Sequence, residues 1–350
     1  MEPTSPPPPA SPDPTAARAL PPVSVVMPVL EEEPYLEESV ERVLAQEYDG
    51  EVEVVLAVGP SKDRTEAIAQ RIAAGEPRVR VVPNPTGFTP HALNAALAAS
   101  SHPYVVRVDA HGFLPAGYLR RVVELLETTG AANVGGRMQV EGEDDFGRAV
   151  AVAMSSRLGI GGSKFHVGGE PGPAQTVYLG AFRREVVERL GGFDEHYRRA
   201  QDWELNYRIR AAGETIWFDP DLAVTYRPRR TLKALVKQFH GSGRWRRQVV
   251  DHHPDTASVR YLAPPVVTAL VAGGLTAGVV GRATGLRTLE AGWLLPAGYV
   301  AAVAAASLPE GRDLSPRARA WLPVVVAAMH LSWGSGFLRN VAPEERVPRG

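Results

Sequence analysis

An aspartate and a histidine two residues apart follow a short apolar run, in the segment Tyr104-Val105-Val106-Arg107-Val108-Asp109-Ala110-His111. The β-branched residues of this run predict a buried parallel strand, and open α/β sheets bind ligands just beyond the carboxyl ends of their strands. A carboxylate and an imidazole at that place can hold a divalent cation, Mn²⁺ or Mg²⁺, that binds the diphosphate of a nucleotide. We therefore expect a site for transferring a group from a nucleotide carrier. Two simpler roles stay open: Asp109 as a cap of the turn, and His111 as a direct partner of a phosphate.

The elements around this segment alternate between strand and helix. Strands are predicted over 23–29, 51–58, 79–82 and 104–108, and helices from Pro34 onward, over 62–74 and over 90–100. Such alternation is typical of a parallel sheet with helices on both faces. Right-handed crossovers then place every strand-to-helix turn on one rim of the sheet. We expect that rim to collect the loops at 31–33, 59–63, 83–89 and 109–112.

Composition restricts the class of protein. The chain has 350 residues, enough for one large domain with an appendage. Its 38 basic and 39 acidic residues nearly cancel, so the overall charge gives no indication of nucleic-acid binding. The sequence has no cysteine, which excludes disulfides, thiol catalysis and thiolate metal sites.

The two ends of the chain differ from its middle. Residues 1–22 contain nine prolines and predict a disordered tail rather than a secretory signal. Residues 232–250 mix apolar with basic side chains, a pattern typical of a helix on an anionic membrane surface. Three uncharged segments follow, at 262–281, 291–308 and 321–338, each long enough for a membrane helix. Their many small residues would suit close helix packing, and the alternatives are a soluble helical appendage or a hairpin in the membrane plane.

Several motifs occur in the order found in the family 2 glycosyltransferases, which have the GT-A fold. The first is Pro22-Val23-Ser24-Val25-Val26-Met27-Pro28-Val29 with Glu31-Glu32, and the second is the Asp-x-His segment described above. The others are Gly135-Gly136, 153–159 (AMSSRLG), 177–183 (VYLGAFR), Gly191-Gly192-Phe193-Asp194 and 201–206 (QDWELN). Over residues 22–250 the chain resembles this family, and within it the glucosyltransferases of succinoglycan biosynthesis. The implied fold class is α/β: a Rossmann-like GT-A sheet of the nucleotide-diphospho-sugar transferases, with a C-terminal helical membrane region.

The resemblance also implies a reaction and the residues that perform it. A sugar would move from a nucleotide-sugar donor to a lipid-linked or polysaccharide acceptor with inversion, which requires a base and charge compensation on the leaving diphosphate. Asp202 is the implied base, and a helix N-cap is its alternative role. The implied donor-binding residues are Pro28, Glu31, Ser61, Asp63, Arg107 and Asp109, and the implied metal ligands are Asp109 and His111. The implied acceptor and diphosphate residues are Gly180, Trp203, Glu204, Arg244 and Trp245.

One departure from the family pattern concerns the nucleoside. The second strand of the family usually ends in an aspartate that contacts the base, whereas this chain has Val58 there, in Ala57-Val58-Gly59-Pro60-Ser61-Lys62-Asp63-Arg64-Thr65. Asp63 could substitute for that aspartate, or it could cap the following helix. Glu31 belongs to a run of three glutamates that could also be only a solvated loop.

These observations predict five segments: a tail over 1–22, a catalytic domain over 23–228, a basic amphipathic segment over 229–260, three candidate transmembrane helices over 261–338 and a tail over 339–350. Basic residues before the first candidate helix place the catalytic domain on the cytoplasmic side of the cell membrane. A chain ending near Val250 is then expected to be soluble. The alternatives are a non-catalytic membrane scaffold of the same fold and a nucleotidyltransferase. Against the latter, no glycine-rich phosphate loop follows the first strand.

Overall fold

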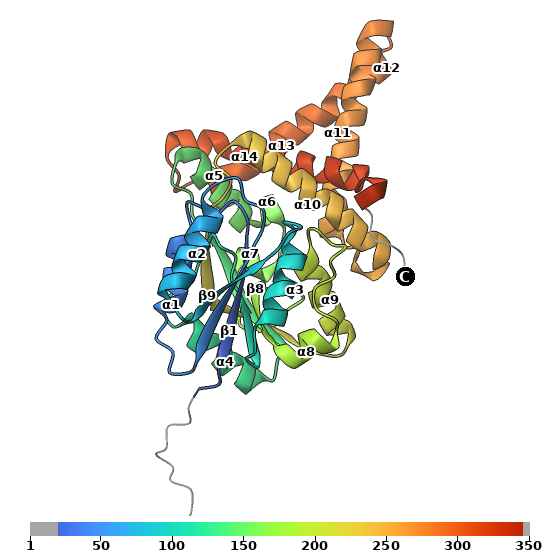
Figure 1. The fold of residues 1–350 in the computed structure, drawn as a ribbon. Helices are drawn as coiled ribbons and strands as arrows, with labels where there is room; N and C mark the ends of the chain where they lie inside the picture. The colour runs from blue at the N-terminus through green and yellow to red at the C-terminus, as the bar shows by residue number, and fades with distance from the viewer. Residues whose placement is uncertain (1–19, 346–350) are drawn as a thin grey trace, which may run out of the picture.

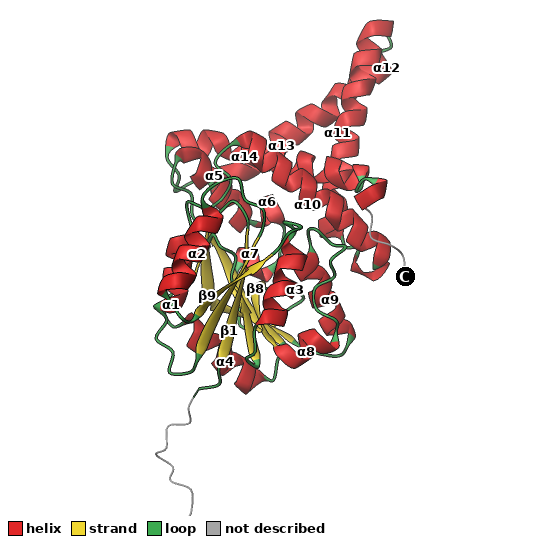
Figure 2. Ribbon diagram, viewed as in Figure 1, coloured by secondary structure: helices red, strands yellow, loops and turns green. Residues whose placement is uncertain are grey.

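The computed structural model describes residues 20–345, and its centre is a mixed sheet flanked by helices (Figures 1 and 2). The first half confirms the predicted alternation. Its elements are β1 (Val23–Val29), α1 (Leu36–Leu44), β2 (Val52–Val58), α2 (Thr65–Gly75), β3 (Val79–Pro83), α3 (Thr89–Ala99) and β4 (Tyr104–Arg107). Helix α2 begins three residues later than predicted, because Asp63 Oδ1 accepts a hydrogen bond from Thr65 N at 3.1 Å and ends the preceding turn.

The second half completes the sheet with a less regular order of elements. They are β5 (Gly112–Phe113), α4 (Tyr118–Thr129), β6 (Asn133–Val140), α5 (Asp145–Ser155), α6 (Arg157–Ile160), α7 (Lys164–Val167), β7 (Gly172–Pro173), β8 (Tyr178–Arg183), α8 (Arg184–Arg189), α9 (Gln201–Ala211) and β9 (Ile216–Tyr226). The strand order is β3-β2-β1-β4-β8-β6-β9-β5, with β7 paired to β9. Strand β8 runs antiparallel between β4 and β6, whereas β1, β2, β3 and β4 are mutually parallel and β6 is parallel to β9.

Apolar side chains fill both faces of this sheet. One face packs against α1, α2 and α4, which contribute buried residues such as Leu36, Ala69 and Leu119. The other face packs against α3, α8 and α9. Because both faces are covered, ligands can approach the sheet only at its ends. The carboxyl ends of β1, β2, β4, β6 and β9 share one rim, as the predicted crossovers require.

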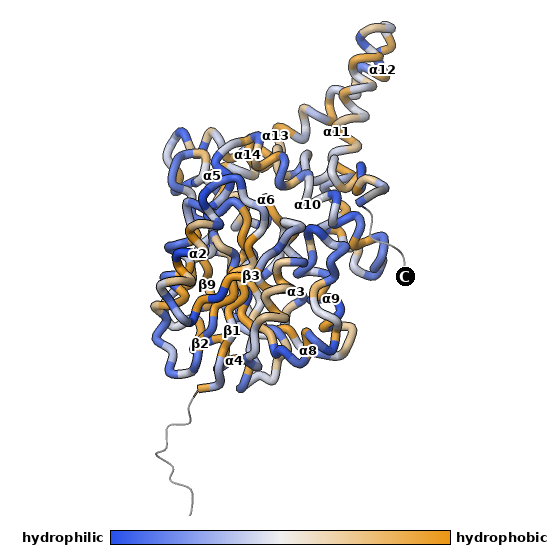
Figure 3. Tube along the Cα trace, in the orientation of Figure 1, coloured by the Kyte–Doolittle hydropathy of each residue, from blue (hydrophilic) through white to orange (hydrophobic). Residues whose placement is uncertain are grey.

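Five further helices follow the sheet: α10 (Leu232–His252), α11 (Val259–Thr284), α12 (Arg287–Glu290), α13 (Leu294–Glu310) and α14 (Pro316–Arg339). Short 3₁₀ turns occur at Pro254–Thr256, Ala291–Trp293 and Pro343–Glu345. The segments Val259–Thr284, Arg287–Glu310 and Pro316–Arg339 are each long and apolar enough to cross a membrane. Figures 1 and 3 show α11, α12 and the start of α13 projecting away from the sheet domain, with many hydrophobic residues along them.

Small residues bring the two arms of this projection together. A Cβ added at Gly274 or Gly278 of α11 would lie 2.7 Å from Gly292 O or Trp293 Nε1, closer than real side chains approach. The close contacts expected from the small-residue composition are therefore present. The outward side chains of the arms are apolar and exposed, including Val266, Leu270 and Leu294. Such a surface is stable in lipid rather than in water.

Helix α14 differs from the projecting arms because its start contacts α5 of the sheet domain and its end contacts α10. At its start, Ser315 Oγ donates a hydrogen bond to Asp145 Oδ1 of α5 at 2.6 Å. At its end, Arg244 Nε donates to Asn340 O at 2.8 Å. A helix of 24 residues is about 36 Å long, so α14 extends across the domain between these two contacts.

Helix α14 is also part of the domain's hydrophobic core. Its residues Leu322, Val325, Val326 and Met329 are at most 1% exposed and pack in one cluster with α5, α10 and Tyr226. Removing α14 would expose that cluster to water. The structure therefore reverses the expectation of a soluble chain ending near Val250. The predicted tail over 339–350 is likewise ordered where it is described, since Val341 is 2% exposed. Most of the predicted tail over 1–22 lies outside the described residues.

Candidate active site

Arg107 links the predicted donor and acceptor sides of the site. Its Nε and Nη2 donate hydrogen bonds to Asp109 Oδ1 and Oδ2 at 2.9 and 3.3 Å. Burial disfavours the charge of Arg107, but the carboxylates of Asp109 and Asp202 outweigh it and raise its pKa. The two carboxylates therefore lie near one guanidinium. Asp109 comes from the end of β4 and Asp202 from the first turn of α9, so the rim brings together residues 93 positions apart.

Asp202 is exposed and free to meet a ligand. Among residues 20–345, its Oδ1 accepts a hydrogen bond only from the backbone N of Trp203, at 2.8 Å. Helix α9 begins at Gln201 and its N-cap position is Ala200, so Asp202 lies inside the first turn and is not the cap. Ala200 has φ +63°, an unusual value for alanine, and this conformation turns the chain into α9.

His111 is held by a second carboxylate. Its Nδ1 lies 2.7 Å from Glu32 Oε1, and its ring lies 5.9 Å from that of Tyr226. Burial disfavours the charged ring, but the hydrogen bond to Glu32 and the charge of Asp109 raise the pKa of His111. Burial opposes ionisation of Asp109 too, but Arg107 and His111 lower its pKa. Glu32 was predicted as part of the family motif, and the structure gives it this orienting contact.

The donor atoms of Asp109 and His111 fit a divalent cation. Because a carboxylate only accepts, Nδ1 of the neutral His111 ring carries the proton and Nε2 keeps its lone pair. Metal-bound histidines in proteins typically have such a carboxylate partner on the other nitrogen. Residues 20–345 contain no group of three ligating side chains. A cation here would therefore take its other ligands from the nucleotide phosphates and water.

Two arginines without carboxylate partners add positive charge to the site. Within the described chain, neither Arg199 nor Arg229 forms an ion pair. Desolvation and the charge of Arg229 lower the pKa of Arg199, and the charge of Arg229 also acts on His111. A Cβ at Gly241 would lie 3.6 Å from Arg199 Nε, so this guanidinium lies over α10. Cations gathered here can compensate the charge of a diphosphate.

The loops after β1 and β2 are joined by two side chains, Ser61 and Asp63, that were predicted to bind the donor or cap a helix. Ser61 Oγ accepts from Glu31 N at 3.0 Å, and Asp63 Oδ2 accepts from Glu33 N at 3.3 Å. Asp63 Oδ1 also accepts from Thr65 Oγ1 at 2.5 Å, which lowers the pKa of Asp63. These bonds shape the loop of Glu31, which has φ +56° and an exposed side chain.

The second strand ends without a polar side chain directed at a nucleoside. Val58 is 8% exposed and belongs to the main hydrophobic cluster. Pro28, half-buried in β1, lies opposite Ala57 in the parallel register. The exposed Leu30 approaches Gly59, where an added Cβ would lie 3.0 Å from Leu30 Cδ1. The surface beside the two loops is therefore apolar at this point.

The predicted acceptor residues divide into two groups. Trp203 lies beside Asp202, and the Arg246 guanidinium lies 3.8 Å from the centre of its ring. Glu204 is buried and accepts from Arg208 Nε at 2.6 Å within α9. Gly180 is in β8, where a Cβ would lie 2.5 Å from Asn133 Oδ1.

Arg244 and Trp245 lie away from Asp202 and its neighbours. Arg244 Nη2 binds Glu345 Oε2 at 2.8 Å, and Trp245 is 6% exposed in a cluster with Tyr197, Val249 and Val341. Both residues attach α10 to the segment that follows α14. The structure thus does not bring them together with the donor-side residues.

A buried tyrosine joins the site although it was not predicted as a site residue. Tyr178 of β8 is 9% exposed, and its hydroxyl has no hydrogen-bond partner in the described chain. Burial and the charge of Asp109 raise its pKa well above the usual value. The hydroxyl therefore stays protonated and is available to donate a hydrogen bond to a ligand in the site.

We expect Tyr178→Phe to lower kcat/KM by about tenfold without destabilising the protein, because a hydroxyl with no protein partner is lost. Tyr118→Phe is the matched control, since Tyr118 donates to Leu179 O at 3.3 Å. The control should lower the melting temperature and leave kcat/KM near the wild-type value. Equal activity of Tyr178→Phe and wild type would remove Tyr178 from the site.

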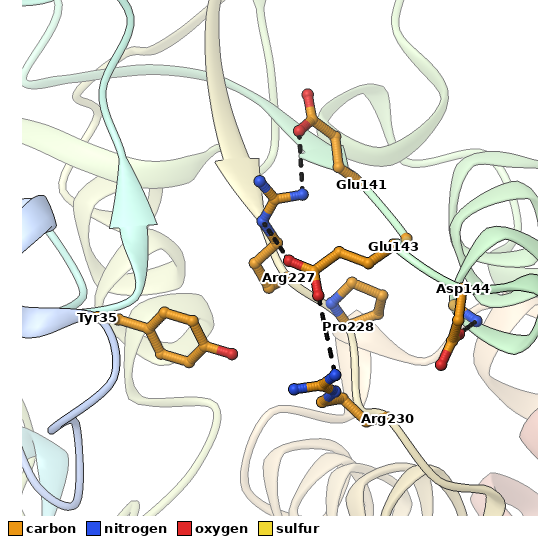
Figure 4. A pocket seen from close by; sticks show the side chains of 9 residues that line it. Tyr35, Glu141, Glu143, Asp144, Arg227, Pro228 and Arg230 are labelled. Atoms are coloured by element: carbon orange, nitrogen blue, oxygen red, sulfur yellow. Dashed lines mark hydrogen bonds and ion pairs between the residues drawn. The ribbon is translucent and has the colours of Figure 1, made fainter.

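A separate cleft lies on the same rim, between the start of α1 and the segments after β6 and β9 (Figure 4). Tyr35 forms one wall, and Arg227 and Arg230 form another. Arg227 Nη1 lies 3.3 Å from Glu141 Oε2, and Arg230 Nη2 lies 4.0 Å from Glu143 Oε2. These charges compensate one another, unlike those of Arg199 and Arg229.

The site residues missed by sequence reasoning come from segments distant along the chain. Tyr178 and Tyr226 belong to β8 and β9, whereas Arg199 lies before α9 and Arg229 after β9, and only the packing of these segments brings the four residues together. The one available signal was the basic run after the last strand, Arg227-Pro228-Arg229-Arg230. It indicates positive charge at the rim but not which arginine faces the ligand.

Comparison with known proteins agrees with this geometry. Residues 24–191 match the model of the family described as "Glycosyl transferase family 2". The chain is 33% identical over 324 residues to the succinoglycan biosynthesis protein ExoA of Rhizobium meliloti, covering 91% of this chain and 94% of that protein. It is 23% identical, over 62% of this chain and 70% of the other, to a dolichyl N-acetyl-alpha-D-glucosaminyl phosphate 3-beta-D-2,3-diacetamido-2,3-dideoxy-beta-D-glucuronosyltransferase of Methanococcus voltae.

A solved structure has the same fold. The mannosyltransferase PcManGT from Pyrobaculum calidifontis, in complex with GDP-Man and Mn²⁺, superposes with a TM-score of 0.54 at 23% identity. The match covers 91% of this chain and 88% of that one, so it includes the C-terminal helices as well as the sheet.

Proposed function

Because the chain belongs to glycosyl transferase family 2, we propose that it is an inverting, metal-dependent hexosyltransferase that moves a sugar from a nucleotide-sugar donor to a lipid-linked or polysaccharide acceptor. The observation that supports this most is the position of Arg107 near both Asp109 and Asp202. A donor-side carboxylate and an exposed candidate base beside one guanidinium are what a single displacement requires.

Each of the site residues has a separate role in this reaction. Asp202 takes the proton of the acceptor hydroxyl as it attacks the anomeric carbon, and the departing diphosphate develops negative charge. Asp109 and the Nε2 of His111 would hold a divalent cation, Mn²⁺ or Mg²⁺, which compensates part of that charge when bound. Arg199 and Arg229 supply the remaining positive charge. Glu32 holds the imidazole of His111 in the required orientation.

The relatives support the proposed substrates. One takes part in succinoglycan biosynthesis by its name, and another is named for a dolichyl-phosphate-linked acceptor. The solved structure of the same fold was obtained with a sugar nucleotide and Mn²⁺. We therefore place this chain in polysaccharide biosynthesis, with a nucleotide-sugar donor. Because Val58 offers no carboxylate to a base, the choice of nucleotide would depend on backbone groups of the neighbouring loops.

A donor panel tests this proposal. The purified full-length protein, in detergent, is titrated with uridine, guanosine and thymidine diphosphate sugars with Mn²⁺, with Mg²⁺ and with a chelator. We expect one nucleotide series to bind and to release nucleoside diphosphate only when a cation is present. If no sugar nucleotide binds, the non-catalytic scaffold becomes the better account. Cation-independent release would remove the metal role of Asp109 and His111.

We also propose that the protein is anchored in the cell membrane by a two-helix hairpin. The arms would be α11 and the 24-residue segment Arg287–Glu310, with α10 and α14 at the membrane surface on the side of the catalytic domain. The contact of the start of α14 with α5 of that domain and the contact of its end with α10 support this arrangement. The basic residues of α10 support a cytoplasmic position for this side.

Single cysteines can report this topology, because the natural chain has none. We expect Pro343→Cys to be labelled by an impermeant thiol reagent from the same side of sealed vesicles as Ser101→Cys in the catalytic domain. Ala283→Cys, at the far end of α11, should be labelled from the opposite side. If Pro343→Cys is labelled together with Ala283→Cys, all three candidate helices cross the membrane.

A further inference from the structure

Three arginines meet where the catalytic domain joins the first candidate membrane helix. We call Arg210, Arg246 and Arg260 the interface arginines; they belong to the last turn of α9, the middle of α10 and the first turn of α11. The guanidinium of Arg246 lies 3.8 Å from the ring centre of Trp203 and 3.5 Å from that of Tyr261. Both of its faces are thus covered, and only its edge remains for hydrogen bonding.

These charges have no carboxylate partner. None of the interface arginines forms an ion pair within residues 20–345, and the neighbouring Asp255 instead accepts from the Tyr207 hydroxyl at 3.3 Å. Arg246 is 5% exposed, and its one hydrogen bond in this range runs from Nη2 to Thr256 O at 3.3 Å. Burial, together with the charges of Arg260 and Arg210, lowers the pKa of Arg246 to about 10.

Several buried hydrogen-bond donors in this region also lack a partner in the described chain. The Nε atoms of Arg246 and Arg210 are buried and have no partner in the described chain. The same holds for Nδ1 of His166, which is 9% exposed and lies within range of the charge of Arg260. Buried, unpaired donors and uncompensated cations are costly in a folded protein. An anion with several oxygens would accept hydrogen bonds from these donors and would compensate the positive charge, because arginine binds phosphate with paired hydrogen bonds.

The location indicates which anion. Trp203, whose ring centre lies 3.8 Å from the Arg246 guanidinium, directly follows Asp202 in the first turn of α9, so one helical turn carries both the proposed base and a contact of the interface arginines. On the other side, Arg260 precedes the exposed apolar surface of α11, where Val259, Leu262 and Val266 are 84%, 41% and 55% exposed. A molecule that reached both features would carry a phosphate at the arginines and a hydrocarbon chain along α11 (Figure 1).

We propose that the interface arginines bind the phosphate or diphosphate of a lipid-linked acceptor, whose hydrocarbon chain follows α11 and whose sugar reaches Asp202. This rests on the proposed glycosyl transfer and assigns the acceptor to the lipid-linked class. Arg246, held between two rings, positions the phosphate, while Arg210 and Arg260 contribute charge. The donor diphosphate, by contrast, belongs to the site of Asp109, Arg199 and Arg229.

Direct binding tests this without requiring turnover. The full-length protein in detergent is titrated with a polyprenyl diphosphate, with the matched polyprenol and with inorganic pyrophosphate. We expect the polyprenyl diphosphate to bind at least about tenfold more tightly than either of the others. Inorganic pyrophosphate binding as tightly as the lipid would mean a site for a soluble anion and would overturn the lipid assignment.

Substitutions then locate the site. We expect Arg260→Gln and Arg246→Lys to weaken polyprenyl diphosphate binding by about tenfold without changing polyprenol binding or sugar-nucleotide binding. Arg282→Gln is the control, because Arg282 lies at the far end of α11, 80% exposed, and pairs only with Glu290. Arg246→Lys keeps the charge, so it remains informative if removing the charge prevents folding.

Three other outcomes contradict the proposal. Equal losses in Arg260→Gln and Arg282→Gln would show non-specific attraction of charge. Loss of sugar-nucleotide binding in the interface variants would assign these arginines to the donor. Unchanged lipid binding in folded variants would leave them a purely structural role. If the protein binds the polyprenyl diphosphate through Arg260 but binds no sugar nucleotide, the lipid site stands and the proposed glycosyl transfer fails.

Discussion

Asp202→Asn should reduce turnover by about 100-fold or more while sugar-nucleotide affinity stays within about twofold of wild type. The amide cannot accept the proton of the acceptor hydroxyl, whereas the shape of the side chain is kept. Donor binding should survive because Asp202 is exposed and its one protein hydrogen bond is to its neighbour's backbone. The measurements are steady-state release of nucleoside diphosphate and equilibrium binding of the donor.

Asp49→Asn is the control for this substitution. Asp49 is exposed, precedes the start of β2 and so lies at the opposite end of that strand from the rim loops, and pairs with Arg120 at 2.7 Å. Its variant should keep wild-type turnover. If Asp202→Asn keeps its turnover as well, another group is the base. If it loses donor binding instead, Asp202 belongs to the donor site through its proximity to Arg107.

Asp109→Asn should abolish cation-dependent donor binding and lower the free energy of unfolding by about 3 kcal/mol. Donor binding is lost because the variant removes one of the two proposed protein ligands of the cation. Stability is lost because Arg107, 7% exposed, no longer has the carboxylate that pairs with it. Calorimetric titration of the donor with Mn²⁺ and chemical denaturation measure the two effects separately.

Asp219→Asn separates destabilisation from the loss of the site. Asp219 is fully buried in β9 and binds Arg121 Nη2 at 2.6 Å, so this variant also breaks an aspartate–arginine pair. It should lose less stability, since Arg121 keeps Glu124 at 3.1 Å. Donor binding by Asp219→Asn should stay near wild type. Donor binding lost equally in both variants would show that stability alone explains the Asp109 result.

The first four strands and three helices could be predicted from sequence because local patterns determine them. Each strand is a short run of mainly apolar residues, and each helix carries apolar residues on one side. The right-handed crossover rule then places the following loops on one rim without further information. Arg107, Asp109 and His111 were predicted together for this reason, and the structure places them together.

The rest of the fold and of the candidate site could not be predicted, because it depends on packing between elements that are distant along the chain. Strand β8 is inserted antiparallel between β4 and β6, which no local pattern indicates. The amphipathic helix over 232–250 was predicted, but Arg244 and Arg246 lie about 200° apart around it. Arg244 therefore turns toward Glu345 and Arg246 toward Trp203. Hydropathy alone could not separate α14 from the projecting arms, because its apolar side chains serve the core instead of lipid.

Two glycines make the contact between α10 and α14 too close for any other residue. A Cβ at Gly243 would overlap the carbonyl oxygen of Trp333, and one at Gly336 would overlap that of His240. With both helices at the membrane surface, as proposed, this crossing fixes the height of Asp202 above the lipid headgroups. This fixed height would then select acceptors by the length of their glycan. A glycan whose terminal hydroxyl reaches the height of Asp202 would be extended. The terminal hydroxyl of a glycan a few sugars longer or shorter would not meet Asp202.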